Sequence, residues 1–254
     1  MAFALRALVP AVVLTTLSVA VAFAQDTGQV NPDRPGIGTG AETVARGALQ
    51  METGLDYTRE RRTSWATTLR FGAADGVELR LDWEPVVSLR GAEHATDIGD
   101  LALGTKLRLL QGGDGDVNPT ISLLPTVKLP TAPAPVGTER TDVSLLALVS
   151  FRAGPVDVDF NAGVAAIGQP RGYLLQALTV GTVNWPVTDA LAPFAEVFYN
   201  SPAERGGDDL VGASVGVVVG ITRDIALDAA AITTLAGRGP NYRFQAGVTV
   251  RFWP

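Results

Sequence analysis

The sequence predicts an all-β protein: a transmembrane, antiparallel up-and-down β-barrel of about twelve strands, preceded by a cleaved signal peptide. Apolar and polar residues alternate with a period of two over most of the chain, which is typical of strands with two different faces. The segments that alternate are about 9–13 residues long, and a tilted strand needs about 9–11 residues to cross a bilayer. The links between them alternate between short and long, as in bacterial outer-membrane barrels.

The composition agrees with a β protein and excludes several kinds of chemistry. The 254 residues include 28 Gly and 16 Pro, which suit strands joined by turns better than helices. The absence of cysteine excludes disulfides, zinc–thiolate sites, a cysteine nucleophile and a lipoprotein anchor. The chain has one histidine and a net charge of −6, so neither a His-rich metal site nor a nucleic-acid-binding surface is expected. We expect no metal and no cofactor.

Residues 1–24 have the layout of a secretory signal peptide. Arg6 precedes an apolar run from Ala7 to Phe23, and the pattern Ala22-Phe23-Ala24 forms a cleavage site. The alternative is a permanent membrane helix, but Pro10 and the short apolar stretch disfavour it.

Residues 25–47 form a leader that is rich in Gly and Pro and shows no periodicity. Its charged residues Asp33, Arg34 and Glu42 would suit a lumen of mixed charge, so we expect the leader to plug the periplasmic mouth of the barrel. The alternative is a mobile tail. Its Gly36–Gly40 segment resembles a nucleotide-binding loop, but no predicted strand precedes it and no helix follows, which excludes that function.

The barrel is expected to occupy residues 48–254. The alternation is clearest in the last segment, where Phe244, Val248 and Phe252 share one face and Arg243 and Arg251 lie on the other. Further strands are expected at residues 77–84, 101–109, 156–161 and 211–220, and less sharply at 49–59, 64–72, 120–128, 142–152, 174–185, 191–200 and 225–233.

The links fall into two classes. The short ones are residues 73–76, 153–155, 188–190 and 222–224, and the long ones are residues 88–96, 130–140, 168–172, 201–208 and 235–240. Barrels have short periplasmic turns and longer extracellular loops, so this order also predicts the orientation. Two links depart from the pattern: residues 112–119 are long where a short turn is expected, and residues 60–63 are tight where a loop is expected.

Charged residues of both signs recur on one face of the predicted strands. On an open sheet this would be the solvated face, but the chain offers no helical segment to cover the apolar face. Closure into a barrel places lipid against the apolar face and makes the polar face a lumen. The residues predicted to line the pore are Glu52, Arg70, Glu78, Arg80, Asp82, Lys106, Arg108, Asp157, Asp159, Asp228, Arg243 and Arg251. Those predicted to form interfacial girdles are Tyr57, Trp65, Trp83, Trp185, Tyr199, Tyr242 and Trp253.

The sequence contains no complete catalytic motif. Asp114, Asp116 and Asn118 match the opening of a calcium-binding loop, but Pro119 and Pro125 occupy the positions that need Gly and Glu. His94 has no nearby Ser or Asn in a supporting motif, so we do not expect an enzyme.

Short motifs at both ends of the mature chain resemble one known family. These are Asp33-Arg34-Pro35, Glu42-Thr43-Val44, Gly47, Leu49-Gln50, Glu52 and Gly54 near the start, and Tyr242-Arg243-Phe244, Gly247 and Arg251-Phe252 near the end. They are similar to outer-membrane proteins associated with phenol meta-pathway degradation and described as transporter-like. The resemblance implies a β-barrel that moves small molecules and supplies no catalytic residues. The chain departs from it by ending in Trp253-Pro254, where such barrels end in an aromatic residue.

Together these features predict a passive pore in the bacterial outer membrane for small molecules, aromatic or hydrophobic ones included. The expected partners are outer-membrane lipid, the outer-membrane assembly machinery and a small-molecule solute, but not nucleic acid. Two alternatives stay open: a structural barrel without transport, and a barrel enzyme that hydrolyses lipid.

Overall fold

The computed structural model describes residues 28–59, 61–91, 94–113 and 117–253. The predicted signal peptide, residues 1–24, lies outside these ranges, as do Asp114 and Asp116 of the acidic turn. No helix in the described part is long and apolar enough to cross a membrane.

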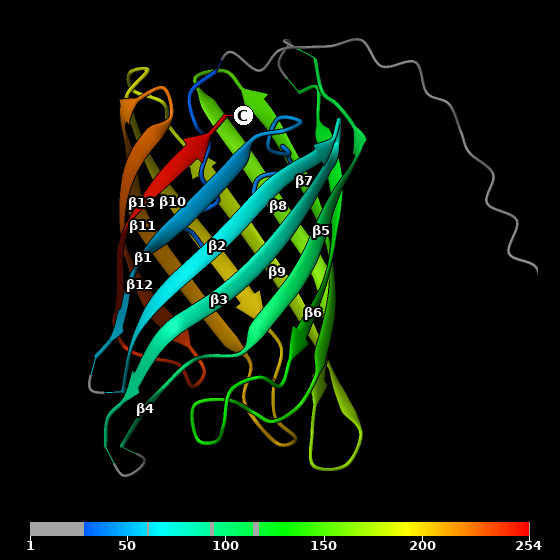
Figure 1. The fold of residues 1–254 in the computed structure, drawn as a ribbon, viewed down its shortest axis with the longest axis vertical. Helices are drawn as coiled ribbons and strands as arrows, with labels where there is room; N and C mark the ends of the chain where they lie inside the picture. Colours follow the sequence, from blue (N-terminus) through cyan, green and yellow to red (C-terminus); the bar gives the residue numbers. More distant parts are fainter. Residues whose placement is uncertain (1–27, 60, 92–93, 114–116, 254) are drawn as a thin grey trace, which may run out of the picture.

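Twelve antiparallel strands close into a barrel, as predicted (Figure 1). Each barrel strand pairs with its neighbour in the chain, and β13 pairs with β1 to complete the ring. A thirteenth strand, β4, is short and pairs only with the end of β3. The strands are β1 (Leu49–Thr58), β2 (Arg62–Ala74), β3 (Val77–Leu89), β4 (Ala95–Asp97), β5 (Leu101–Leu110), β6 (Thr120–Leu129), β7 (Asp142–Ala153), β8 (Val156–Gly168), β9 (Tyr173–Asn184), β10 (Leu191–Asn200), β11 (Leu210–Thr222), β12 (Ile225–Ala236) and β13 (Arg243–Phe252).

The two ends of the barrel differ in their connections. The tight turns at residues 75–76, 154–155 and 223–224 lie at the end where the chain finishes (Figure 1). The loops at residues 130–141 and 201–209 lie at the other end. Short turns are periplasmic and longer loops extracellular in bacterial barrels, so we name the first end periplasmic and the second extracellular.

The sequence misplaced parts of β3 and the link that follows it. The alternation predicts an end at Glu84, because Glu84-Pro85 breaks it. Instead β3 continues to Leu89 through a bulge, with Trp65 of β2 paired to Val86. Proline is tolerated at a bulge because no ladder hydrogen bond needs its missing N–H. The predicted loop at residues 88–96 therefore contains the end of β3 and the start of β4. Likewise, the link before β10 spans residues 185–190 rather than 188–190.

The barrel has a polar interior and an apolar outer surface. Arg70, Glu78 and Lys106 are at most 2% exposed, whereas Phe244 and Phe252 are nearly half exposed. Buried charges with exposed large apolar side chains invert the arrangement of a soluble domain. This distribution fits a wall with lipid outside and a lumen inside.

The aromatic residues predicted to form girdles lie in different places on the barrel. Trp185, Tyr199 and Tyr242 are exposed near strand ends. Trp83 lies mid-way along β3, because that strand is longer than predicted. Trp253 lines the cavity at the periplasmic mouth, where its indole Nε1 donates a hydrogen bond to Asp224 at 3.0 Å.

Candidate functional site: the leader within the lumen

The leader runs through the inside of the barrel at its periplasmic end (Figure 1). Near its entry Val30 N donates to Arg223 O at 2.8 Å, and near its exit Gly47 N donates to Gly72 O at 2.7 Å. Between Gly28 and Gly47 the leader makes hydrogen bonds or ion pairs with residues of β1, β2, β3, β5, β6, β7, β8, β10, β12 and β13. The leader therefore contacts almost the whole inner circumference.

Three glutamates of the wall accept hydrogen bonds from leader N–H groups. A buried segment without secondary structure has N–H groups that need acceptors, and a carboxylate can accept from two at once. The bonds run from Asp33 N and Arg34 N to Glu52 (3.1 and 3.0 Å), from Ile37 N and Gly38 N to Glu196 (2.8 and 2.9 Å), and from Val44 N to Glu78 (2.8 Å). These contacts fix the course of a segment that has no ladder of its own.

The glycine-rich segment of the leader allows a close approach to the wall. A Cβ on Gly36 would lie 2.5 Å from Glu196 Oε1, and one on Gly38 would lie 2.5 Å from Thr182 Oγ1. A side chain at either position would have to displace the Glu196 carboxylate or the Thr182 hydroxyl, so glycine allows this close approach. The pattern that resembles a nucleotide loop thus serves contact with the barrel wall.

Asp33 is the centre of a buried ionic cluster. Its carboxylate lies 3.3 Å from Arg70 Nη1 and 3.2 Å from Lys106 Nζ, and it also accepts a hydrogen bond from Arg80. Burial raises the pKa of Asp33, but the attraction of Arg70, Lys106 and Arg80 outweighs it, and the net pKa lies well below the ordinary value. Arg70 also contacts Glu52 at 2.8 Å, so the cluster joins several wall strands to the leader.

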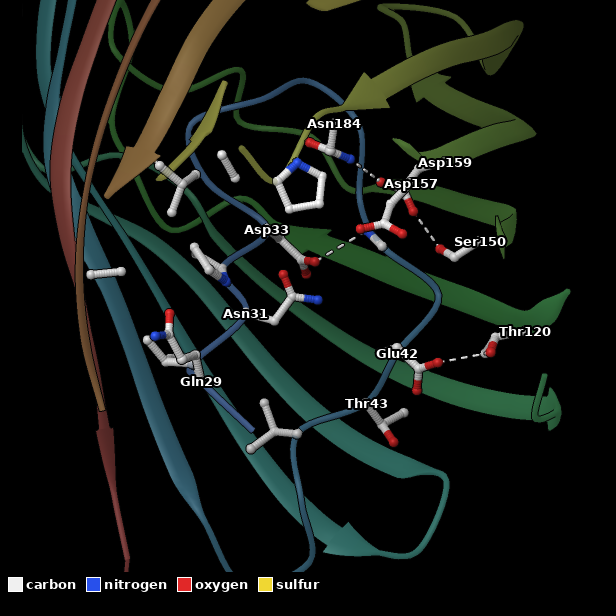
Figure 2. Close-up of a pocket in the computed structure, with 18 of the residues that line it drawn as sticks. Gln29, Asn31, Asp33, Glu42, Thr43, Thr120, Ser150, Asp157, Asp159 and Asn184 are labelled. Carbon is white, nitrogen blue, oxygen red and sulfur yellow. Dashed lines mark hydrogen bonds between the residues drawn. The ribbon is translucent and has the colours of Figure 1, made fainter. Parts of the chain in front are cut away.

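The other charged leader residues also contact the wall. Glu42 accepts a hydrogen bond from Thr120 Oγ1 at 2.7 Å, seen in Figure 2, and lies 3.3 Å from Arg108 Nη1. Arg34 lies 3.6 Å from Asp228 Oδ1. Its guanidinium is packed so closely on β1 that a Cβ on Gly54 would lie 2.7 Å from Arg34 Nη2.

The residues predicted to line the pore lie in three places. Asp157 and Asp159 line the cavity at the periplasmic mouth. Asp82 and Arg243 contact side chains of neighbouring strands, Thr68 and Asp56 respectively. The others contact the leader: Glu52, Arg70, Glu78, Arg80, Lys106, Arg108, Asp228 and Arg251.

A cavity of about 1530 Å³ lies at the periplasmic mouth, with the leader forming part of its wall. Its lining includes Arg108 and Arg251 together with Asp157 and Asp159, so charges of both signs face it. Asp159 accepts a hydrogen bond from Asn184 at 2.8 Å, as Figure 2 shows. The lining comes from the leader, the turns and the periplasmic ends of the strands, so this space is a vestibule.

An apolar belt follows the polar contacts on their extracellular side. One inward position further along the strands from Ser122, Ser150, Thr182 and Glu196 lie Leu124, Leu148, Val180 and Phe198, respectively. Leu124 and Leu148 pack against Ala41 of the leader, and Val180 and Phe198 lie in a cluster with Ile232 against which Ile37 packs. The lumen directly beyond the leader is therefore apolar along β6, β7, β9, β10 and β12, whereas β1, β3 and β13 carry the charged residues Asp56, Asp82 and Arg243 there.

The aromatic side chains of this wall lie across glycines of the next strand. Phe194 and Phe198 of β10 pair in register with Gly216 and Gly212 of β11. A Cβ on Gly216 would lie 2.5 Å from the Phe194 ring, and one on Gly212 would lie 2.2 Å from the Phe198 ring. The two rings thus lie over β11.

Sequence reasoning missed the neutral leader-binding residues and the apolar belt. Ser122, Ser150 and Asn161 bind leader backbone atoms at 2.6–2.8 Å. They are uncharged, whereas the luminal residues were predicted from their charge. Phe198 and Leu148 are large apolar residues, so their residue type alone suggests that they face lipid. Their position on the same period-two face as Glu196 and Ser150 is the signal that could have found them.

The described residues offer no arrangement for metal chemistry. Among residues 28–253, the masked positions aside, no group of three His, Cys, Asp or Glu is placed to hold a metal ion. His94 is exposed in the link between β3 and β4.

Residues 32–252 match the model of the family described as "Putative MetA-pathway of phenol degradation". The chain belongs to this family. A comparison with curated proteins gave no match. The family assignment agrees with the resemblance noted in the sequence, since the matched range covers both the leader and the whole barrel.

Solved structures of outer-membrane channels share the fold of this family member. The COG4313 outer membrane channel from Pseudomonas putida F1 is 17% identical with a TM-score of 0.64, and the match covers 88% of this chain and 100% of the channel. The NanC porin is 9% identical with a TM-score of 0.56, over 80% and 98% of the two chains. The KdgM porin, solved in complex with disordered oligogalacturonate, is 9% identical with a TM-score of 0.53, over 80% and 99%.

Proposed function

We propose that this protein is a passive pore of the bacterial outer membrane and that its leader acts as a plug. The observation that carries the proposal is a segment without strand structure docked inside a closed barrel. Hydrogen bonds, ion pairs and small apolar contacts hold it, and none of the barrel's strand ladders includes it. Displacement of the leader would therefore open the lumen without unfolding the wall.

The fold of the solved relatives supports a pore over an enzyme or a purely structural barrel. The matched proteins with the higher TM-scores are a channel and two porins. A structural barrel also gains nothing from a vestibule of about 1530 Å³ lined by charges of both signs. We propose that a small-molecule solute enters this space, while the apolar outer face holds the barrel in lipid and the outer-membrane assembly machinery inserts it.

The apolar belt favours solutes that carry an aromatic or aliphatic group. Barrel interiors of porins are polar, since they conduct ions and hydrophilic solutes. Here Leu124, Leu148, Val180 and Phe198 face inward from neighbouring strands. A flat apolar solute would gain contact with this wall, while a charged group on the same solute would find cations at Arg80 on β3 and Lys106 on β5.

Deletion of residues 26–43 tests the plug. We expect a barrel that folds, shown by heat-modifiable gel migration, and that leaks small solutes faster than the full chain in proteoliposomes. Comparing benzoate with glucose as solutes tests the apolar belt. The deletion should increase the leak rate of benzoate more than that of glucose. A folded deletion variant whose leak is unchanged would exclude the plug.

A lipid-hydrolysis assay separates the pore from the enzyme alternative. We expect no phospholipid hydrolysis by the full chain in detergent micelles. If hydrolysis occurs and is lost in His94→Ala, the protein is a barrel enzyme.

A further inference from the structure

Arginines gather on the outer rim of the barrel at its extracellular end. Arg61 directly precedes β2 and Arg90 directly follows β3, and Arg90 N donates to Arg61 O at 2.9 Å. Arg62, the first residue of β2, donates a hydrogen bond to Glu84 at 2.8 Å. Arg61 itself lies in the turn before β2, and its side chain is exposed.

Arg90 is held against outward-facing side chains. Its Nη2 donates to Thr63 Oγ1 at 3.1 Å, and its guanidinium carbon lies 5.5 Å from the centre of the Tyr57 ring. A hydroxyl and a ring orient the guanidinium without neutralising its charge. Arg90 is therefore a positioned cation on the outside of the wall.

The arginines stand directly beyond exposed aromatic side chains. Trp65 on β2, Tyr242 in the link before β13 and Phe244 on β13 are 45%, 52% and 48% exposed, and β2 and β13 are the two strands that flank β1. Arg59 adjoins them, because its N–H donates to Tyr242 O at 3.3 Å. Aromatic side chains with a band of arginines beyond them are typical of the level where acyl chains give way to lipid headgroups.

We propose that this rim patch, defined by Arg61, Arg90 and Tyr57, binds a phosphate group of the glycolipid that forms the outer leaflet. The inference rests on the outer-membrane location in the proposed function. A guanidinium fork matches the geometry of a phosphate, and an anionic headgroup attracts each nearby arginine. The patch complements that charge at the depth where the aromatic residues place the headgroups.

Arginines at the other end of the barrel are placed differently. Arg152 contacts Asp157 at 2.9 Å, and Arg223 lies 3.8 Å from Asp224. Both line the periplasmic vestibule rather than the lipid-facing wall. The outward-facing arginine patch thus lies at the extracellular rim, which favours a lipid of the outer leaflet over one of the inner leaflet.

The test compares the full-length protein with Arg61→Gln/Arg90→Gln. Both are purified in a non-ionic detergent and titrated with bisphosphorylated lipid A, with binding followed by native mass spectrometry. We expect affinity to fall roughly 30-fold in the double variant, about the effect of two arginines near an anionic surface. The matched control, Arg171→Gln/Arg238→Gln, removes the same charge from exposed loops and should bind lipid A like the unmodified protein.

Two further ligands identify what the patch recognises. Lipid A without its phosphates should bind the unmodified protein as weakly as intact lipid A binds the double variant, and inorganic phosphate alone should not compete at millimolar concentration. Equal lipid A binding by the double variant and the unmodified protein would overturn the proposal, as would competition by inorganic phosphate alone. Solute leak should be the same in all variants, so a failure of the pore function is seen separately.

Discussion

Replacing Asp33 by Asn should release the leader from the lumen. The substitution keeps the shape of the side chain but removes the charge that Arg70, Arg80 and Lys106 share. Glu52 and Glu78 would then face three cations in a cluster whose members are at most 10% exposed. Loss of one partner from a buried ionic group costs about 3–5 kcal/mol.

If the leader leaves the lumen as the proposed plug does, this cost falls on docking and not on the barrel. A penalty of about 3 kcal/mol shifts the ratio of docked to released leader by more than about 100-fold. Trypsin should then cut the folded Asp33→Asn variant after Arg46, and the channel conductance of this variant should rise. Asp208→Asn is the matched control, since Asp208 pairs with Arg238 in an exposed loop. An Asp33→Asn variant that resists trypsin and conducts like the unmodified protein would refute the ionic-cluster argument.

Further predictions concern pH, selectivity and the orientation of the strands. The pKa of Asp33 is lower in the docked state than its ordinary value of 3.8. The contribution of Asp33 to docking is therefore complete above pH 3.8 and is lost progressively as the pH falls below that value. Conductance should be the same at pH 7 and pH 5 and higher at pH 3. Replacing both Arg80 and Arg108 by Gln should shift ion selectivity toward cations, measured as the reversal potential in a salt gradient. An unchanged reversal potential would place the ion path elsewhere. Val217→Arg should impair membrane assembly by about 2–4 kcal/mol, since Val217 faces lipid, whereas Val218→Arg should assemble because Val218 lines the vestibule; equal yields of folded protein would contradict the assigned faces.

The sequence alone determined the fold class, because lipid on one side and a lumen on the other impose a local period-two pattern. Val248 and Thr249 reveal their faces by residue type, and strand length follows from membrane thickness. The charged luminal residues could be found in the same way. The sequence misplaced the end of β3, since Pro85 breaks the pattern and a bulge that depends on pairing with β2 restores it.

Only the tertiary structure decided how the leader lies and which wall residues hold it. The leader has no periodicity, so its course is set by acceptors such as Glu52 and Glu196 that lie far apart in the chain. The cations around Asp33 come from β2, β3 and β5, and they meet only because ring closure and strand register place them at one level of the lumen. Register is a non-local property, and a slip of one residue would turn Arg70 to the lipid face.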